Sequence, residues 1–142
     1  YLKSLLITDV STVAKLTNLE TLNLHCINAL NLKEVNKLIN IRKLYVGANQ
    51  LQFFSNLKNL TSLHINAGID FKLLKNFPDL KILKIEYNVM REDIKNFSNL
   101  QRLEELELLY NPDKNLPISK QDLENLRNML PDTEVTLKDR GW

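Results

Sequence analysis

The chain has 142 residues, of which 44% are hydrophobic and 25% are charged, a composition typical of one globular domain. A formal net charge of +2, without any run of basic residues, does not indicate a surface for nucleic acid. No apolar stretch approaches the roughly 18 residues of a membrane-spanning helix, and the single cysteine, Cys26, excludes an internal disulfide framework.

The chain starts at Tyr1 within sequence that already looks like part of a repeat, and we expect a fragment or a processed form. Leu2, Leu5 and Ile7 fit a first short strand. In the alternative interpretation, residues 7–10 follow a strand that lies further upstream. The first strand is the preferred interpretation.

Five copies of one hydrophobic pattern follow, beginning at residues 19, 41, 60, 80 and 103. The copy at 41–51 reads Ile-x-x-Leu-x-Val-x-x-Asn-x-Leu, which is a complete leucine-rich-repeat consensus. In every copy the fourth and sixth positions are hydrophobic and alternate with other residues, the pattern of a short strand with one buried face. The copies beginning at 41, 80 and 103 carry asparagine at Asn49, Asn88 and Asn111, where a side-chain amide can satisfy backbone groups at the end of the strand.

Between the strands, hydrophobic residues recur at every third position, as on one face of a 3₁₀ helix or a short, tight helix. Four segments have this spacing: Leu32, Val35, Leu38 and Ile41; Phe54, Leu57 and Leu60; Phe71, Leu74, Phe77 and Leu80; Ile94, Phe97, Leu100 and Leu103. Each repeat is therefore predicted to be a strand followed by a compact return segment, and both bury their hydrophobic residues between them. Since one repeat cannot bury this surface alone, stacked repeats must share a core.

The last part of the chain departs from the repeat pattern at residues 111–112, which are Asn-Pro. Ser119 and Asp122 have the spacing of a capping box and predict the start of a helix. Its apolar face would be formed by Leu123, Leu126 and Leu130. Pro131 ends this helix, and residues 135–137 predict a final strand. We expect residues 112–142 to be a carboxyl-terminal capping unit that shields the end of the core.

Three segments, 7–19, 19–40 and 111–137, resemble repeats of bacterial leucine-rich-repeat proteins of the internalin-like class. The resemblance and the repeats together imply an α/β fold: a right-handed leucine-rich-repeat solenoid, or horseshoe. Short parallel strands would line its concave face, 3₁₀ or short helical segments its convex face, and a helix would cap its carboxyl end. We expect residues 1–142 to form a single domain of about six repeats without an amino-terminal cap. Members of this class typically hold a protein partner on the concave face.

Strand positions 3, 5 and 7 should point away from the core, and position 8 lies beside them. A polar and aromatic middle zone and an acidic zone nearer the carboxyl end are expected on this surface. The candidate ligand-binding residues are Asn23, His25, Lys43, Tyr45, His64, Asn66, Lys84, Glu86, Tyr87, Glu105, Glu107 and Tyr110. Aromatic side chains on a solvated sheet favour an interface, and the acidic zone favours a basic patch on the partner.

Catalytic chemistry has little support in the sequence. His25 and His64 lie two strands apart and cannot share a zinc ion. The one candidate base near Cys26 is the adjacent His25, whose side chain should leave the strand on the other side. We therefore predict no enzyme activity, no metal and no cofactor. The predicted function is recognition of another protein, without nucleic acid and without membrane insertion. A targeting or substrate-recruiting arm of a multidomain enzyme or effector, and a structural spacer, remain alternatives.

Overall fold

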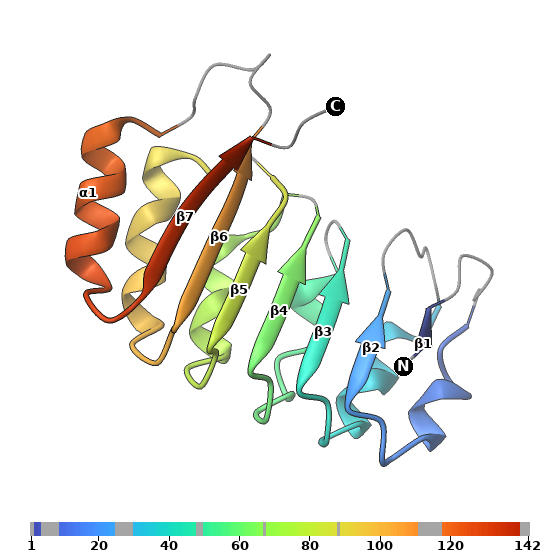
Figure 1. Ribbon diagram of the computed structural model, residues 1–142. Helices are drawn as coiled ribbons and strands as arrows, with labels where there is room; N and C mark the ends of the chain where they lie inside the picture. The colour runs from blue at the N-terminus through green and yellow to red at the C-terminus, as the bar shows by residue number, and fades with distance from the viewer. Residues whose placement is uncertain are drawn as a thin grey trace.

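The computed structural model describes residues 2–3, 9–24, 30–47, 50–66, 68–87, 89–110 and 118–139. Within these residues, seven strands form one parallel sheet in which the strands follow the order of the chain (Figure 1). The strands are β1 (Leu2–Lys3), β2 (Thr21–Asn23), β3 (Lys43–Val46), β4 (Ser62–Ile65), β5 (Ile82–Ile85), β6 (Glu105–Tyr110) and β7 (Glu134–Asp139). The sheet is open, so the predicted stack of parallel strands is confirmed.

The return segments lie together behind one face of the sheet, and none of the described helices lies on the other face (Figure 1). Five of them are 3₁₀ helices: η1 (Val13–Lys15), η2 (Leu32–Lys37), η3 (Leu51–Phe53), η4 (Phe71–Asn76) and η5 (Arg91–Asn99). The sixth is the α-helix α1 (Lys120–Met129). The predicted 3₁₀ geometry is therefore confirmed. The uncovered side, which the sequence predicts as the concave face, is called the open sheet face below.

The core is a set of hydrophobic rows that run across the strands. The fourth positions of the repeats stand in register from β2 to β7, and each of these residues is buried; we call them the core row: Leu22, Leu44, Leu63, Leu83, Leu106 and Val135. Opposite them, the residues spaced by three on the return segments are buried as predicted, apart from half-buried Leu32. Phe71 and Phe97 connect η4 to η5, with ring centroids 5.7 Å apart. Because each fully buried leucine contributes about 1.5–3 kcal/mol, these rows hold the repeats together.

The carboxyl-terminal helix begins as the capping box predicts. Ser119 Oγ accepts a hydrogen bond from the Asp122 backbone N–H at 3.1 Å, and the Ser119 N–H donates to Asp122 Oδ2 at 2.9 Å. These hydrogen bonds to Ser119, backbone first and then side chain, lower the pKa of the Asp122 carboxyl. Arg91 Nε of η5 lies 3.2 Å from Asp122 Oδ1, so the same carboxylate ties α1 to the preceding repeat.

Asparagine has a structural role at the edge where the strands begin. Asn40 Nδ2 donates to the Thr17 carbonyl at 2.9 Å, and Asn59 Nδ2 donates to the Ile39 carbonyl at 2.8 Å. Each amide thus bonds to the backbone of the preceding repeat and joins two neighbouring repeats. The sequence analysis missed this signal, which is an asparagine directly before the first hydrophobic position of the repeat.

Some predicted features fall outside the described residues. The asparagines predicted to close the strand ends, Asn49, Asn88 and Asn111, are among them. The first strand is present as β1, which pairs with β2, whereas Leu5 and Ile7 also lie outside the described part of the chain. A further parallel bridge joins Asp9 to Leu30. Among the described helices, none is long and apolar enough to cross a membrane.

Candidate functional site

The open sheet face is built from residues that alternate with the core residues along each strand. One position after the core row, a second row stands in register across β2 to β7; we call it the outward row: Asn23, Tyr45, His64, Lys84, Glu107 and Thr136. Neighbouring members are separated by the strand spacing of about 4.8 Å. All six residue types differ, so adjacent strands place unlike chemical groups side by side.

The candidate residues differ in how far they reach solvent. Asn23 and Glu107 are buried, with 6% and 9% of their surfaces exposed. Lys43 and Tyr87 are exposed, while His25 lies outside the described residues. The remaining seven are half-buried: Tyr45, His64, Asn66, Lys84, Glu86, Glu105 and Tyr110.

Leu109, a hydrophobic neighbour of Tyr110 on β6, is also half-buried, and the sequence analysis did not include it among the candidates. Its place at position 7 of the repeat, on the same side of the strand as Glu105 and Glu107, was the available signal. Burial therefore separates the candidates into groups that a partner could reach easily and groups that are largely enclosed by their neighbours.

Tyr45, His64 and Glu86 form a connected group at the middle of the open sheet face. The rings of Tyr45 and His64 are tilted by 55° with their centroids 5.4 Å apart. His64 Nε2 lies 2.7 Å from Glu86 Oε1, a hydrogen bond that becomes an ion pair when the imidazole is protonated. These contacts run across three successive repeats and hold an aromatic ring, an imidazole and a carboxylate in one half-buried cluster, which we call the aromatic cluster.

Tyr87 follows the end of β5 and is 48% exposed. Its ring lies against Gly68 of the preceding repeat, so that a Cβ atom at Gly68 would stand 3.1 Å from Tyr87 Cε1 and 3.1 Å from Cζ. A large aromatic side chain is therefore packed against backbone on one side while about half of its surface remains available.

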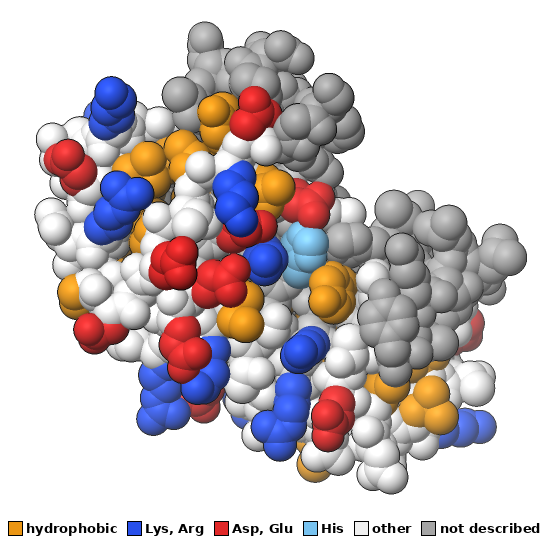
Figure 2. Space-filling model, viewed as in Figure 1, with side chains coloured by type: hydrophobic (Ala, Val, Ile, Leu, Met, Phe, Trp, Pro, Cys, Tyr) orange, Lys and Arg blue, Asp and Glu red, His pale blue; other side chains and the backbone are white. Residues whose placement is uncertain are grey.

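A second group of side chains on β5, β6 and β7 forms a network of ion pairs, which we call the charge ladder. Lys84 Nζ lies 3.3 Å from Glu105 Oε1 and 3.7 Å from Glu107 Oε1. On the other side, Lys138 Nζ donates to Glu107 Oε2. The zone predicted to be acidic is thus largely neutralised by the two lysines, and Figure 2 shows acidic and basic side chains interspersed on this face.

The ladder changes the titration of its members. The hydrogen bond from Lys138 lowers the pKa of the Glu107 carboxyl, with a further contribution from Lys84, against the opposing effect of burial. The same hydrogen bond raises the pKa of the Lys138 ammonium group. Both groups therefore keep their charges over a wider pH range in the folded protein than they would in the unfolded chain.

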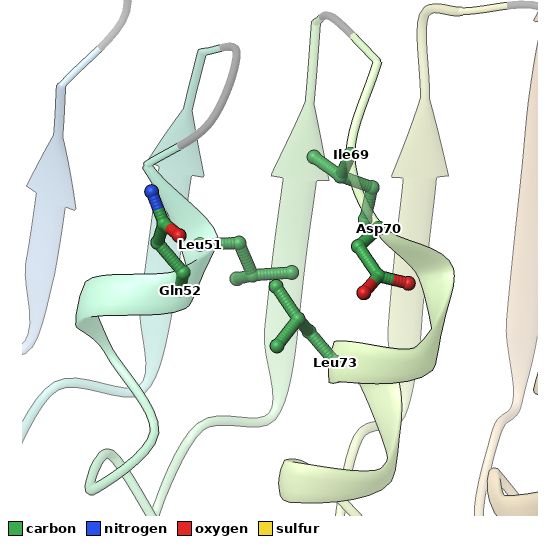
Figure 3. A pocket seen from close by; sticks show the side chains of 5 residues that line it. All are labelled: Leu51, Gln52, Ile69, Asp70 and Leu73. Carbon is green, nitrogen blue, oxygen red and sulfur yellow. The ribbon is translucent and has the colours of Figure 1, made fainter.

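The described residues contain no group of three or more His, Cys, Asp and Glu side chains that could hold a metal ion. A small hollow with a cavity volume of about 50 Å³ lies between η3 and η4, away from the open sheet face, and is lined by Leu51, Gln52, Ile69, Asp70 and Leu73 (Figure 3). Its volume is below the range of about 300–1,000 Å³ that small-molecule sites usually have.

Comparison with known proteins identifies the fold. No protein-family model matches the chain, and no curated protein is similar to it at a significant level. Among solved structures, the chain is similar to a leucine-rich-repeat protein of Leptospira interrogans, with a TM-score of 0.61 and 24% identity over 89% of this chain. It is also similar to an internalin of Listeria monocytogenes, with a TM-score of 0.54 and 20% identity over 94% of this chain.

These similarities show that the chain has the leucine-rich-repeat solenoid fold that the sequence predicts. The matched regions span 33% of the Leptospira chain and 47% of the Listeria chain. Neither similarity transfers a ligand to this protein.

Proposed function

We propose that this chain is a non-catalytic module that binds another protein on the open sheet face, with the aromatic cluster and Tyr87 as the main contacts. Solenoids of stacked repeats typically use such an extended, regular surface for binding. All-parallel sheets are usually covered on both faces, whereas in the described part of this chain the return segments cover only one. A protein partner would supply the second cover.

The observation that carries the proposal is the exposure of aromatic residues on this sheet. Tyr87 is 48% exposed and Tyr45 is half-buried beside His64. Tyrosine is enriched among the residues that dominate binding energies, because it offers a large rigid surface together with a hydroxyl group. Neither ring belongs to the buried hydrophobic core.

The charge ladder has a different role in this proposal. Since Lys84 and Lys138 already neutralise Glu105 and Glu107, a basic partner would have to displace an existing ion pair to reach either carboxylate. The ladder thus favours a partner surface of low net charge over the strongly basic patch that the sequence suggested. Binding should accordingly depend only weakly on salt concentration.

The test is affinity capture from a lysate of the source organism or of its host, with wild type beside a Tyr45→Ala, His64→Ala, Tyr87→Ala triple variant. A matched control changes three exposed lysines on the return segments to alanine: Lys72, Lys75 and Lys95. We expect one protein to be retained by wild type and by the control but lost by the triple variant. Circular dichroism must show that both variants are folded.

The same experiment separates the alternatives. A partner that binds the triple variant as well as wild type would place the interface elsewhere. A structural spacer predicts no specific partner for any of the three proteins. A targeting arm of a larger enzyme or effector predicts the expected capture pattern, followed by modification of the captured protein when the arm is attached to its catalytic domain.

A further inference from the structure

Gly68 lacks the usual conformational reason for a glycine. Glycine is required where the backbone adopts a positive φ, and Gly68 does not lie in that region. The alternative reason is space, since a close approach by another group leaves no room for a side chain. Here the approaching group is the Tyr87 side chain. Its Cε1, Cζ and Oη atoms lie 3.1–3.3 Å from the position that a Cβ atom of residue 68 would occupy.

The contact does not serve the hydrophobic core. Tyr87 is 48% exposed, and Gly68 lies in the connection between β4 and η4 at the end of the sheet. What the contact provides is a fixed position for the ring, with one side on the backbone of the preceding repeat and the rest of the ring facing outward. An aromatic group that is already ordered before binding loses less conformational entropy in a complex.

We propose that Gly68 is a positioning residue for the binding face: its missing side chain allows the hydroxyl end of the Tyr87 ring to lie against the preceding repeat, so that the ring is presented to a partner. The inference rests on the proposed function and deepens it by assigning Tyr87 as a preorganised anchor. It also states the kind of group that the partner must offer, which is a flat or extended side chain that stacks on a phenol ring. A methyl group at position 68 would require the Tyr87 ring to move by a few tenths of an ångström.

The position of the ring can be tested in the free protein by nuclear magnetic resonance. We expect nuclear Overhauser contacts between the Gly68 α-protons and the Tyr87 ring protons. The α-protons should also be shifted by the ring current, and this shift should disappear in Tyr87→Ala. Absence of both signals in wild type would overturn the proposal before any binding is measured, and this test does not depend on the folding of a variant at position 68.

The effect on binding can be measured with a synthetic single-domain binder, selected in vitro on wild type and counter-selected on Tyr87→Ala. For this probe we expect Tyr87→Ala to weaken binding by about 30-fold or more, because it removes a hot-spot side chain. We expect Gly68→Ala to weaken binding by about tenfold, because it displaces the same side chain without removing it. The double variant should be no weaker than Tyr87→Ala alone, because both changes remove the same contact. Tyr87→Phe should keep most of the affinity, and Lys72→Ala on η4 should keep all of it.

Two results would overturn the positioning role. In the first, Gly68→Ala binds the probe like wild type although Tyr87→Ala does not. In the second, the losses add in the double variant, which would mean that Gly68 acts independently of Tyr87. Because the binder is selected on this face, the test is separate from the capture experiment. If the natural partner is indifferent to Tyr87→Ala and also to the triple variant while the binder behaves as expected, the proposed binding face fails and the Gly68–Tyr87 arrangement stands. A natural partner that is lost by the triple variant but indifferent to Tyr87→Ala would overturn Tyr87 as its anchor and leave the proposed face in place.

Discussion

The core row and the outward row differ by one position along the strands, yet they follow opposite rules. The core row contains only leucine and valine, and each residue is at most 7% exposed. The outward row contains six different residue types, whose surroundings range from buried Asn23 to half-buried Lys84. Successive side chains on a strand point to opposite faces. Each short strand therefore carries one residue that must be hydrophobic for the repeats to stack and a neighbouring residue whose type can vary.

The two rows contribute to stability in different ways. A core residue must match the same residue of the neighbouring repeat, since packing between repeats provides most of the stability of a solenoid. An outward residue meets its neighbours mainly through polar contacts, such as the pair of His64 with Glu86. Substitutions in the two rows should consequently have effects of very different size.

The strongest test of the comparison places a charge in the core row. Leu106 is fully buried, and we expect Leu106→Asp to lower the free energy of unfolding by more than about 4 kcal/mol, because a buried carboxylate has no partner there. Urea denaturation followed by circular dichroism measures the change. The matched control is Leu109→Asp on the same strand, where the side chain is half-buried on the open sheet face and the cost should stay below about 1 kcal/mol. Equal costs would contradict the assignment of the two faces.

A smaller effect is expected in the charge ladder. Glu107→Gln removes the ion pairs with Lys84 and Lys138, and we expect a loss of about 1 kcal/mol, since both lysines can turn to solvent. Glu104→Gln is the control, because Glu104 pairs with Lys81 and both side chains are more than half exposed. This control should change stability by less than about 0.5 kcal/mol. A Glu107→Gln variant as stable as the control would show that the ladder is a surface feature only.

The same carboxylate makes part of the stability depend on pH. The pKa of Glu107 is lower in the folded protein than its ordinary value near 4.5. Its contribution is therefore fully present above that ordinary value and is lost as the pH falls through the lower, folded-state value. We expect the stability difference between wild type and Glu107→Gln to shrink on acidification below pH 4.5, as urea titrations at several pH values would show. A difference that is constant with pH would contradict the pKa shift.

The smallest effect concerns Thr136, the member of the outward row on β7. Its Oγ1 atom is buried and has no hydrogen-bond partner within the described residues. Thr136→Val keeps the shape of the side chain and removes the unsatisfied hydroxyl, so we expect stability to rise by about 0.5–1 kcal/mol. Thermal unfolding measures it, with Thr133→Val as the contrasting variant, since Thr133 Oγ1 donates to the Leu103 carbonyl at 2.6 Å. A loss of stability in Thr136→Val would show that the hydroxyl has a partner after all.

Most of the fold could be predicted from the sequence, because the repeats encode it several times. The spacing of leucines identified the strands, and the spacing by three identified the return segments, whose 3₁₀ geometry follows from the same residues. Ser119 and Asp122 marked the start of α1 correctly. The asparagines Asn40 and Asn59 were overlooked because their hydrogen bonds reach into the preceding repeat, a contact that a single segment does not reveal.

The candidate site was predictable only in part. The alternation along the strands placed Tyr45 and His64 side by side, and the register confirms that they are neighbours. Alternation does not say how deeply a side chain is enclosed, so Glu107 was expected on the surface and proves to be 9% exposed. The contact of Tyr87 with Gly68 had no sequence signal at all, since the two residues belong to different repeats.

By itself, the sequence determined the architecture of this protein: a parallel stack of repeats with a hydrophobic core and a capped helix at the carboxyl end. This was possible because the spacing of the hydrophobic residues determines which side chains are buried, and the same spacing recurs in every repeat. The tertiary structure alone decided which outward side chains meet. Ion pairing of Glu107 with Lys138 and packing of Tyr87 on Gly68 depend on distances between repeats, which arise only after the strands have stacked.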